Sequence, residues 1–445
     1  MIYEEKLQNV SVLGAAGKMG SGILLLTAVE LADLQLKPEN KSKPFIINAI
    51  DVSPTALSGL YLYLKTQVKK IAEKKVVQLR ALYSDHKELI ENSEIIEQYV
   101  DDVLKLVLFS TRVESSYDSR VIFEAIVEDV DVKVKVFKQI LANNPHKPWF
   151  LTNTSSVPIG ELDQKADMGG KIIGFHFYNP PAVQKLVELI TSQSTNPELI
   201  EFSNAYAKSI RKIIVPSNDF AGFIGNGHFM RDLLFGIAQA KRLSSEMALT
   251  EAIFAVNKVS QDFLIRPMGV FQLIDYVGVD VCQKILRVMN SRLKDDSLHS
   301  KYIDTLIEQG VKGGQNADGS QKDGILQYEK GRPIGVWDIG IQCYVHIDTF
   351  ASSVEDKLGQ LPKIHKPWRA VIGDKQKDNY LKEYFSELKG MNTLGATLAK
   401  EFHQNSNNIG LGLVSNGIAD SDENVNTVML TGFFHAYGPI NSYLD

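Results

Sequence analysis

The sequence predicts an α/β chain in two parts, a parallel sheet covered by helices and then a region made mostly of helices. Up to about residue 217, short apolar runs alternate with segments of helical periodicity, which is typical of parallel strands joined by crossover helices. Beyond that residue the periodicity is helical and strand signals are few. A chain of 445 residues has room for two to four domains, and we expect them at residues 1–217, 218–332 and 333–445.

The predicted elements of the first part alternate in a regular order. The apolar run 8–14 ends in glycines and predicts a buried strand, and apolar residues at helical spacing follow it over 18–32. The run 44–51 is apolar and ends in an acid, which predicts a second strand. Further along we expect helices at 54–75 and 87–107, a strand at 121–127, a helix at 131–142 and a strand near 148–152.

The second part has a different pattern, which predicts helices at 222–243, 246–260 and 274–292. The glycine-rich segment 310–332 is typical of a loop, and we expect it to close the second domain. The tail from about 335 to 445 has a less regular pattern.

Two strings in the second part resemble each other. Residues 269–275 read GVFQLID and residues 438–445 read GPINSYLD, and each string follows a helical stretch at a similar distance. Strings of this length also match by chance. A duplicated helical unit would stack two copies so that their apolar faces are buried together, and we therefore expect a degenerate repeat of the helical domain.

Composition excludes several classes of protein. The net charge of −5 is spread along the chain, which gives no basic footprint for nucleic acid or an anionic membrane. No apolar stretch reaches the roughly 18 residues of a membrane-spanning helix, and the N-terminus lacks the features of a secretory signal. The two cysteines, Cys282 and Cys343, lie far apart, so we expect neither a disulfide nor a metal site. These features are typical of a cytoplasmic protein.

A glycine-rich turn follows the first predicted strand. It contains Gly14, Gly17 and Gly20, with Lys18 and Met19 between the last two. Glycines here let backbone amides approach a pyrophosphate, and the helix that starts at this turn directs its positive end toward the phosphates. The spacing is GxxGxxG, one residue longer than the usual GxGxxG, and alone it also fits a purely structural turn.

An acid, Asp51, ends the second predicted strand. In a Rossmann fold an acid at this place accepts hydrogen bonds from the adenosine ribose hydroxyls and repels a 2′-phosphate, so the sequence favours NAD over NADP. The distance along the chain from Gly14 to Asp51 exceeds the usual separation of about twenty residues. The polar segment 37–43 accounts for the excess as a surface insertion.

Four strings further along supply groups suited to proton transfer. They read EAIVED over 124–129, NTSS over 153–156, GFHFYNP over 174–180 with KLVE over 185–188, and GFIGN over 222–226. A histidine moves protons near neutral pH, and a carboxylate on its other nitrogen fixes the tautomer and stabilises the imidazolium. Hydroxyl and amide groups can hold a substrate oxygen.

These strings resemble, in order and interval, those of the L-3-hydroxyacyl-CoA dehydrogenase family: EAxxE, NTSS, HFFNP followed by KLVE, and GFIxNR. The resemblance covers about residues 8–330. It implies that His176 takes the proton of the 3-hydroxyl group while hydride leaves C3 for the nicotinamide, and that Glu188 orients His176 and balances its charge. It implies that Ser155 and Asn226 hydrogen-bond the reacting oxygen or the histidine. It also implies a set of residues around the cofactor, namely Glu128, Lys133, Asn153, Ser155 and Asn179.

Each proposed catalytic residue also has a structural interpretation. A histidine between aromatic residues, like His176, is often a satisfied core residue, and Ser155 can simply cap a helix. Glu188 can be an exposed charge at a strand end, and Asn226 a solvated helix residue. Four strings together in the family's order favour the catalytic interpretation.

The resemblance extends into the helical part. Residues 266–275 resemble the family's PMGPFELxD segment, with Val270 in place of proline, and the tail 417–445 resembles the second helical repeat of multifunctional fatty-acid oxidation proteins. In two-domain relatives the helical domain forms a dimer, and in duplicated relatives the second copy takes the partner's place. The resemblance thus implies a homodimer, or a monomer with an intrachain pseudo-dimer. Gly227 stands where the family usually has arginine, and no hydratase domain is evident.

Lysines gather on the helix expected at 54–75, whose family equivalent lies near coenzyme A. The resemblance therefore implies that Lys69 or Lys70 contacts a phosphate of the acyl-CoA substrate, although a solvated basic face explains these lysines as well. The lysines of this segment are Lys65, Lys69, Lys70, Lys74 and Lys75.

The resemblance implies an NAD-dependent enzyme that oxidises L-3-hydroxyacyl-CoA to 3-ketoacyl-CoA, in fatty-acid β-oxidation or related short-chain acyl-CoA metabolism. Two alternatives stay open. One is a dehydrogenase of a hydroxyacid without coenzyme A on the same scaffold, and the other is a non-catalytic NAD-binding protein.

Overall fold

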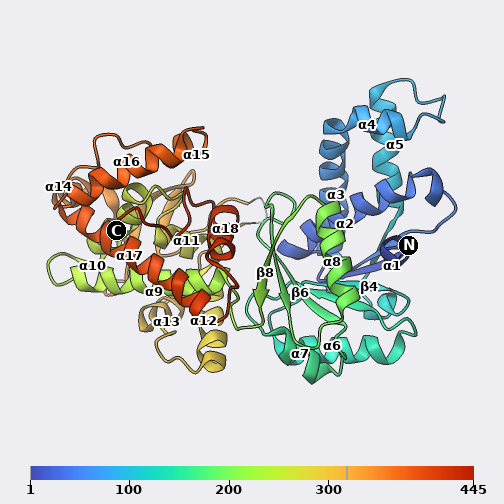
Figure 1. Cartoon of the computed structure of the whole chain (residues 1–445), viewed down its shortest axis with the longest axis horizontal. Helices are drawn as coiled ribbons and strands as arrows, with labels where there is room; N and C mark the ends of the chain where they lie inside the picture. The colour runs from blue at the N-terminus through green and yellow to red at the C-terminus, as the bar shows by residue number, and fades with distance from the viewer. Residues whose placement is uncertain (1, 317–318, 445) are drawn as a thin grey trace. The chain divides into compact units, whose positions relative to one another are not determined.

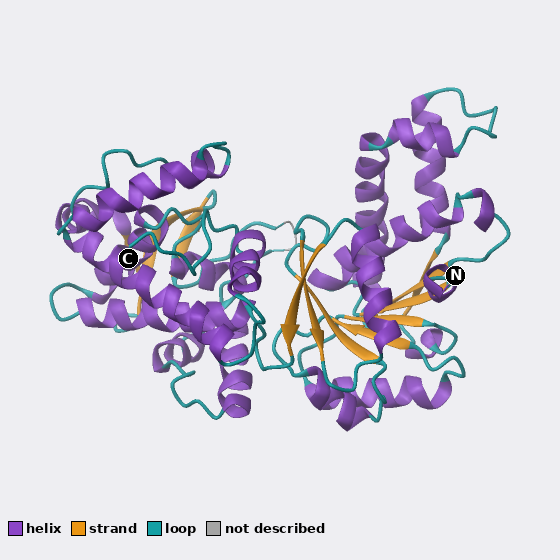
Figure 2. Cartoon of the chain, in the orientation of Figure 1, coloured by secondary structure: helices purple, strands orange, loops and turns teal. Residues whose placement is uncertain are grey.

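The computed structural model describes residues 2–316 and 319–444. The chain divides into two compact units, Met1–Asp219 and Phe220–Asp445. The first unit is built on a sheet and the second is mostly helical, as the sequence predicts (Figure 1, Figure 2). A further division of the second unit at residue 332 stays a prediction, and a strand, β10 (Arg332–Asp338), crosses that point.

The first unit contains an eight-stranded sheet in the order β3-β2-β1-β4-β5-β6-β7-β8. The first six strands in this order run parallel, β7 is antiparallel to β6, and β8 is parallel to β7. The order β3-β2-β1-β4-β5-β6 is that of a Rossmann sheet, in which the direction of strand addition reverses between β1 and β4. The strands are β1 (Asn9–Leu13), β2 (Ile46–Ile50), β3 (Val107–Ser110), β4 (Val121–Glu124), β5 (Trp149–Thr152), β6 (Ile172–Phe177), β7 (Leu186–Thr191) and β8 (Ile213–Asn218).

Helices cover both faces of this sheet, because successive residues of a strand point to opposite sides. Val10 and Val12 of β1 belong to a buried apolar cluster with α2, α5 and α8, whereas Phe150 of β5 packs against Phe137 of α6. Figure 1 shows α6 and α7 together on one side of the strands and α2 and α8 on the other. The helices are α1 (Ile2–Lys6), α2 (Lys18–Gln35), α3 (Pro54–Lys74), α4 (Val76–Leu82), α5 (Asn92–Lys105), α6 (Val130–Asn143), α7 (Ile159–Ala166) and α8 (Pro197–Ser209).

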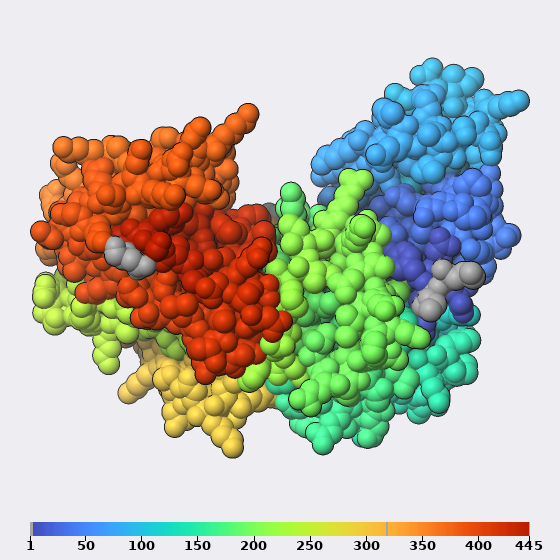
Figure 3. All heavy atoms as spheres, in the orientation of Figure 1, coloured from blue at the N-terminus to red at the C-terminus, as the bar shows by residue number. Residues whose placement is uncertain are grey.

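Helices α3, α4 and α5 form a lobe that projects from the sheet, and the light blue atoms in Figure 3 mark its outer end. The helix expected at 87–107 begins only at Asn92. A capping box explains the difference, since the Glu91 side chain accepts a backbone N–H of the first turn while Glu94 accepts the N–H of Glu91. The separate helix α4 was not expected.

The second unit corrects two expectations. The single helix expected at 274–292 is wrong, because Gly278, with φ of 113°, separates two helices. The expectation of a less regular tail is also wrong, because its described residues contain five helices, one of 22 residues. None of the helices in the described part of the chain has the length and apolar character needed to cross a membrane. The helices are α9 (Gly225–Leu243), α10 (Leu249–Lys258), α11 (Val270–Val277), α12 (Val279–Leu293), α13 (Lys301–Glu308), α14 (Ala351–Leu358), α15 (Trp368–Ile372), α16 (Lys377–Gly390), α17 (Leu394–Ser415) and α18 (Asp422–Gly432).

A small antiparallel sheet, in the order β11-β10-β9, lies between the helices of the second unit. It consists of β9 (Leu326–Glu329), β10 and β11 (Cys343–His346). A loop is expected throughout 310–332, but β9 occupies the last part of this segment, so the expectation is wrong there. The buried carboxylate of Asp275 fixes this segment, because it accepts the N–H groups of Ile325 and Leu326 at 2.7 and 2.8 Å.

The two similar strings of the second unit occupy matching positions. In the first, the Asn257 side chain accepts the N–H of Phe271 at 3.1 Å, and a Cβ added to Gly269 would lie 2.3 Å from the Asn257 oxygen. In the second, the Asn426 side chain accepts the N–H of residue 440 at 3.0 Å, and a Cβ added to Gly438 would lie 2.2 Å from the Asn426 side chain.

One offset, 169 residues, relates the two asparagines, the two glycines, and the first residues of α9 and α17. Helices α9 and α17 also pack against each other. The arrangement supports the expected duplication of a helical unit. Asp445, the last residue of the second string, lies outside the described residues.

Candidate active site

The carboxyl ends of β1 and β4 are neighbours at the point where the strand order reverses, and Leu13 pairs with Glu124 there. In sheets of this kind, ligands bind in the crevice at this point. The glycine-rich turn follows β1, and Glu124 is the last residue of β4. The topology therefore brings two of the strings singled out in the sequence to one place.

The glycine-rich turn has no room for side chains. Gly14 has φ of 74°, and a Cβ there would lie 2.4 Å from the carbonyl oxygen of Ala125. A Cβ on Gly20 would lie 2.0 Å from the carbonyl oxygen of Gly14. No side chain caps α2 at Gly17, and its first turn contains no acid, so the positive end of this helix fits the pyrophosphate of a dinucleotide. Lys18 and Met19 are the first two residues of α2.

Asp51 directly follows β2, and two backbone donors orient it. Its Oδ2 accepts the N–H of Ala16 at 3.0 Å, and its Oδ1 accepts the N–H of Ser53 at 3.1 Å. Each carboxylate oxygen can accept a further hydrogen bond. This arrangement fits the role predicted for Asp51 at the adenosine ribose.

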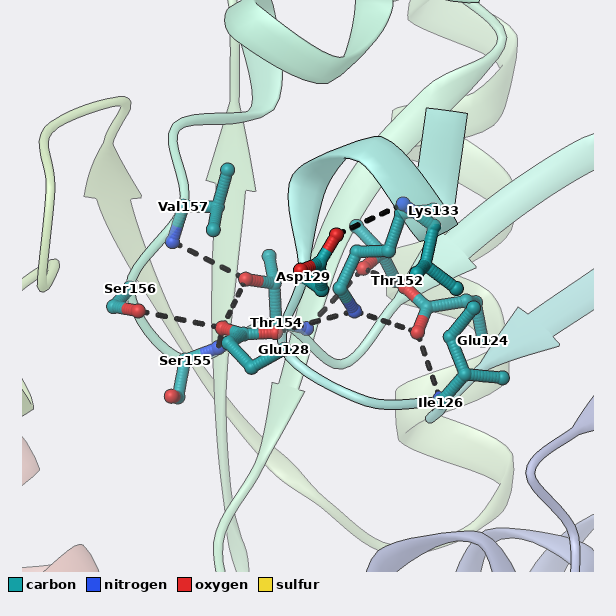
Figure 4. Close-up of polar contacts among 11 residues, drawn as sticks. Glu124, Ile126, Glu128, Asp129, Lys133, Thr152, Thr154, Ser155, Ser156 and Val157 are labelled. Carbon is teal, nitrogen blue, oxygen red and sulfur yellow. Dashed lines mark hydrogen bonds and ion pairs between the residues drawn. The ribbon is translucent and has the colours of Figure 1, made fainter. Parts of the chain in front are cut away.

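A buried lysine lies between two carboxylates beside the turn (Figure 4). The Nζ atom of Lys133 is 2.6 Å from Oε1 of Glu124 and 3.2 Å from Oε2 of Glu128. The Lys133 side chain is 1% exposed and that of Glu124 is 0% exposed. Burial opposes the charge of Lys133, but the two carboxylates outweigh burial and raise its pKa. The hydroxyl of Thr152 donates to the second oxygen of Glu124 at 2.5 Å.

Glu128 receives three further donors from the NTSS segment (Figure 4). Its Oε1 accepts the hydroxyl of Thr154 at 2.5 Å, the N–H of Ser155 at 2.9 Å and the hydroxyl of Ser156 at 3.3 Å. Burial alone would raise the pKa of Glu128, but the Lys133 ammonium and these donors together hold it below its ordinary value. Glu128 is therefore a fixed anion at the end of the sheet.

His176 and Glu188 face each other across the antiparallel pair of β6 and β7, where they are paired in register. The Nδ1 atom of His176 is 3.0 Å from Oε2 of Glu188, and both side chains are buried. The hydroxyl of Tyr178 donates to the same oxygen at 2.9 Å. Burial and the negative charge of Glu188 raise the pKa of Tyr178 well above its ordinary value. The tyrosine hydroxyl therefore keeps its proton and donates it to this hydrogen bond.

The other predicted residues of the first unit lie at strand ends. Asn153 directly follows β5, and its Oδ1 accepts the N–H of Phe177 at 2.8 Å, which ties the end of β5 to β6. Asn179 lies two residues beyond β6, beside Pro180. Lys69 and Lys70 are exposed on α3, so their contact with coenzyme A stays a prediction.

Asn226 is the second residue of α9 and belongs to the second unit. Its approach to His176 therefore stays a prediction. Sequence reasoning missed Glu124, Thr152 and Tyr178 as members of the site. The strings EAIVED and GFHFYNP contain two of these residues, but the sequence does not show which side chains turn inward.

Two matches with a known family cover much of the chain. Residues 9–220 match the NAD binding domain of 3-hydroxyacyl-CoA dehydrogenase. Residues 239–323 match the C-terminal domain of 3-hydroxyacyl-CoA dehydrogenase.

Individual relatives agree with these matches. A probable 3-hydroxybutyryl-CoA dehydrogenase from Bacillus subtilis is 31% identical over 327 residues, which are 73% of this chain and 99% of the relative. The fatty acid oxidation complex subunit alpha of Shewanella oneidensis is 29% identical over 230 residues, 52% of this chain and 32% of that protein. The crystal structure of 3-hydroxybutyryl-CoA dehydrogenase from Escherichia coli shares the fold, with a TM-score of 0.62 at 19% identity over 98% of this chain and 90% of the other.

Proposed function

The chain belongs to the 3-hydroxyacyl-CoA dehydrogenase family of NAD-dependent enzymes, and on that premise we propose that its His176–Glu188 pair removes the hydroxyl proton of an L-3-hydroxyacyl-CoA. The product is the 3-ketoacyl-CoA. The observation that carries this proposal is the contact of 3.0 Å between His176 and a fully buried carboxylate.

The geometry of this contact supports one assignment of the base. A carboxylate can only accept hydrogen bonds, so Nδ1 of His176 is the donor to Glu188. The basic lone pair of the neutral ring is then on Nε2, and that atom takes the proton of the 3-hydroxyl group. The buried negative charge of Glu188 stabilises the imidazolium that results. In the reverse direction the same nitrogen returns the proton to the ketone oxygen.

The first unit is an NAD-binding domain, and the bound cofactor supplies the acceptor for the hydride that leaves C3 of the substrate. Gly14, Gly17 and Gly20 fit the pyrophosphate, and Asp51 fits the ribose. We assign Glu128 to the nicotinamide end of the cofactor, with Lys133 holding that carboxylate in place. The Ser155 hydroxyl and Asn226 would hydrogen-bond the reacting oxygen. These hydrogen bonds would polarise the oxygen and exclude water from it.

Turnover of acetoacetyl-CoA, followed as NADH oxidation at about 340 nm, tests the proposed reaction. We expect turnover by the unmodified chain and a loss of about 10²–10⁴-fold in kcat for His176→Gln, because that is the usual contribution of a general acid–base group. The exposed His146→Gln is the matched control and should retain full activity. Equal rates for His176→Gln and the unmodified chain would exclude His176 as the base.

Free acetoacetate and longer acyl chains complete the test. A preference for acetoacetate over its CoA thioester would favour a hydroxyacid dehydrogenase instead. Binding of NADH without turnover of any 3-ketoacyl-CoA would favour a protein that only binds the cofactor. The names of the relatives in the preceding comparison support short acyl chains and a place in fatty-acid oxidation.

The two helical units related by the offset of 169 residues support a monomer rather than a homodimer. Helices α9 and α17, which occupy matching places in the two copies, pack against each other within one chain. We propose that this contact substitutes for a partner subunit. Sedimentation at low protein concentration should then show a monomer that is fully active.

A further inference from the structure

The second unit contains a cavity of about 370 Å³ between α9, α10, α11 and α13. This volume falls among the roughly 300–1,000 Å³ of pockets that bind small organic molecules. The residues that line the cavity include none of the candidate active-site residues. Its apolar wall is formed by Ile237, Leu249, Ile253, Phe271 and Ile339.

Two lysines, Lys241 and Lys301, line the same cavity, and both are exposed. Among the described residues, neither lysine has a carboxylate within ion-pair distance. The described residues that line the cavity include no aspartate or glutamate. The cavity therefore combines an apolar wall with two lysines that form no ion pair with a described side chain.

The position of Lys301 is not explained by helix stability. It is the first residue of α13, at the positive end of that helix, where a cation is unfavourable. Lys241, in contrast, lies in the last turn of α9, where a cation is favourable. An anion bound between the two lysines would compensate the unfavourable one.

Three helices begin at this cavity. Leu249 is the first residue of α10, Phe271 is the second residue of α11, and Lys301 is the first residue of α13. The positive ends of these three dipoles add to the charge of the lysines, and the negative end of α9, where Lys241 and Ser244 lie, opposes part of it. Tyr302 lines the cavity too, and its hydroxyl is enclosed with no hydrogen-bond partner in the part of the chain that the structure describes. An enclosed donor without a partner is costly, which is a second indication that a polar group is bound nearby.

We propose that this cavity binds a fatty acid, with the alkyl chain against the apolar wall and the carboxylate between Lys241 and Lys301. The apolar wall accounts for the chain, and the positive charge accounts for the anionic head group. The cavity shares no residue with the site assigned to the acyl-CoA substrate, and the proposal does not depend on which residue is the catalytic base.

Calorimetric titration of the full chain with decanoate tests this site. In the double variant Lys241→Gln/Lys301→Gln, the dissociation constant of decanoate should rise about tenfold, which corresponds to two partly exposed ion pairs. The affinity for 1-decanol, which has the same tail without the charge, should change by less than about twofold. The matched control Lys375→Gln/Lys382→Gln removes two exposed lysines of the same unit that lie outside the cavity and should bind decanoate normally.

A bulky side chain at the exposed Ser244, which lines the cavity, provides a second test. Ser244→Trp should abolish binding of both decanoate and decanol while NADH binding and cooperative unfolding persist. Decanoate binding that neither Ser244→Trp nor the lysine pair changes would overturn the proposal and indicate another site. Equal loss in the Lys375/Lys382 control, or no decanoate binding at all, would also overturn it. Conversion of a dimer to a monomer by Ser244→Trp would also overturn the proposal, because the cavity would then be a contact between copies of the chain.

Discussion

Replacing Lys133 with methionine should strongly destabilise the first unit. Methionine keeps most of the length of the side chain but removes the cation that lies 2.6 Å from Glu124 and 3.2 Å from Glu128. Glu124 is completely buried, so its charge cannot be compensated by water. Removing one partner of a buried ion pair typically costs about 3–5 kcal/mol. We therefore expect the free energy of unfolding in urea to fall by about 3–5 kcal/mol and NADH binding to weaken.

Two further variants give the controls for this experiment. Lys135→Met removes an exposed lysine two residues further along the same helix and should change stability by less than about 0.5 kcal/mol. Adding Glu124→Gln to Lys133→Met removes the unpaired buried charge, so part of the lost stability should return. A loss below about 1 kcal/mol for Lys133→Met, or an equal loss for Lys135→Met, would refute the reasoning.

The pH dependence of stability gives an independent check on the same cluster. The native pKa of Glu128 lies below its ordinary value of 4.5, so the stability that this group contributes is present above about pH 4.5 and is lost as pH falls through the native pKa. The native pKa of Lys133 lies above 10.5, so its contribution is present below about pH 10.5 and is lost as pH rises through the native pKa. The difference between the unmodified chain and Lys133→Met should thus be largest, and nearly constant, between these limits.

Four other substitutions test three separate features. Tyr178→Phe removes a donor to Oε2 of Glu188, and because a hydrogen bond to a charged group contributes about 1.5–3 kcal/mol, kcat should fall roughly tenfold or more while NADH affinity stays the same in steady-state and binding assays. Asp275→Asn puts an amide group against backbone donors and should cost about 1–3 kcal/mol in urea unfolding. Burial raises the pKa of Asp275 to about 7, so its contribution is fully present below pH 3.8 and is lost as pH rises through about 7; the variant should lack the corresponding slope in thermal unfolding midpoints. Gly269→Ala and Gly438→Ala each force a methyl group against an asparagine side chain and should each cost about 1–3 kcal/mol, and a cost at one glycine alone would contradict their equivalence.

Much of the first unit could be predicted from the sequence, because its strands are local apolar runs followed directly by helical periodicity. The small sheet of the second unit could not be predicted in this way. Its first strand follows a glycine-rich segment, and the group that fixes it, Asp275, lies 50 residues before Ile325. Local periodicity contains no information about a contact over that distance. The break at Gly278 also depends on a backbone angle that the helical pattern does not show.

The candidate site shows the same limit at the level of side chains. The motifs identify His176 and Glu188, and the antiparallel register of β6 and β7 then places them opposite each other. The motifs do not show that Lys133, nine residues beyond Glu124, turns inward to join two carboxylates. They also do not show that Tyr178 shares an acceptor with His176. Both features depend on how neighbouring strand ends meet in three dimensions.

Two related helical units within one chain can carry different substitutions at equivalent positions. In a homodimer every substitution acts on both sides of the contact, whereas here each copy can change alone. The offset of 169 residues makes Gly395 of α17 the counterpart of Asn226 in α9. A Cβ at Gly395 would lie 2.5 Å from the ring of Phe263, so the second copy has no space for a side chain at this position. At equivalent positions one helical unit thus has an asparagine and the other a glycine packed against an aromatic ring, a difference that two identical subunits could not have.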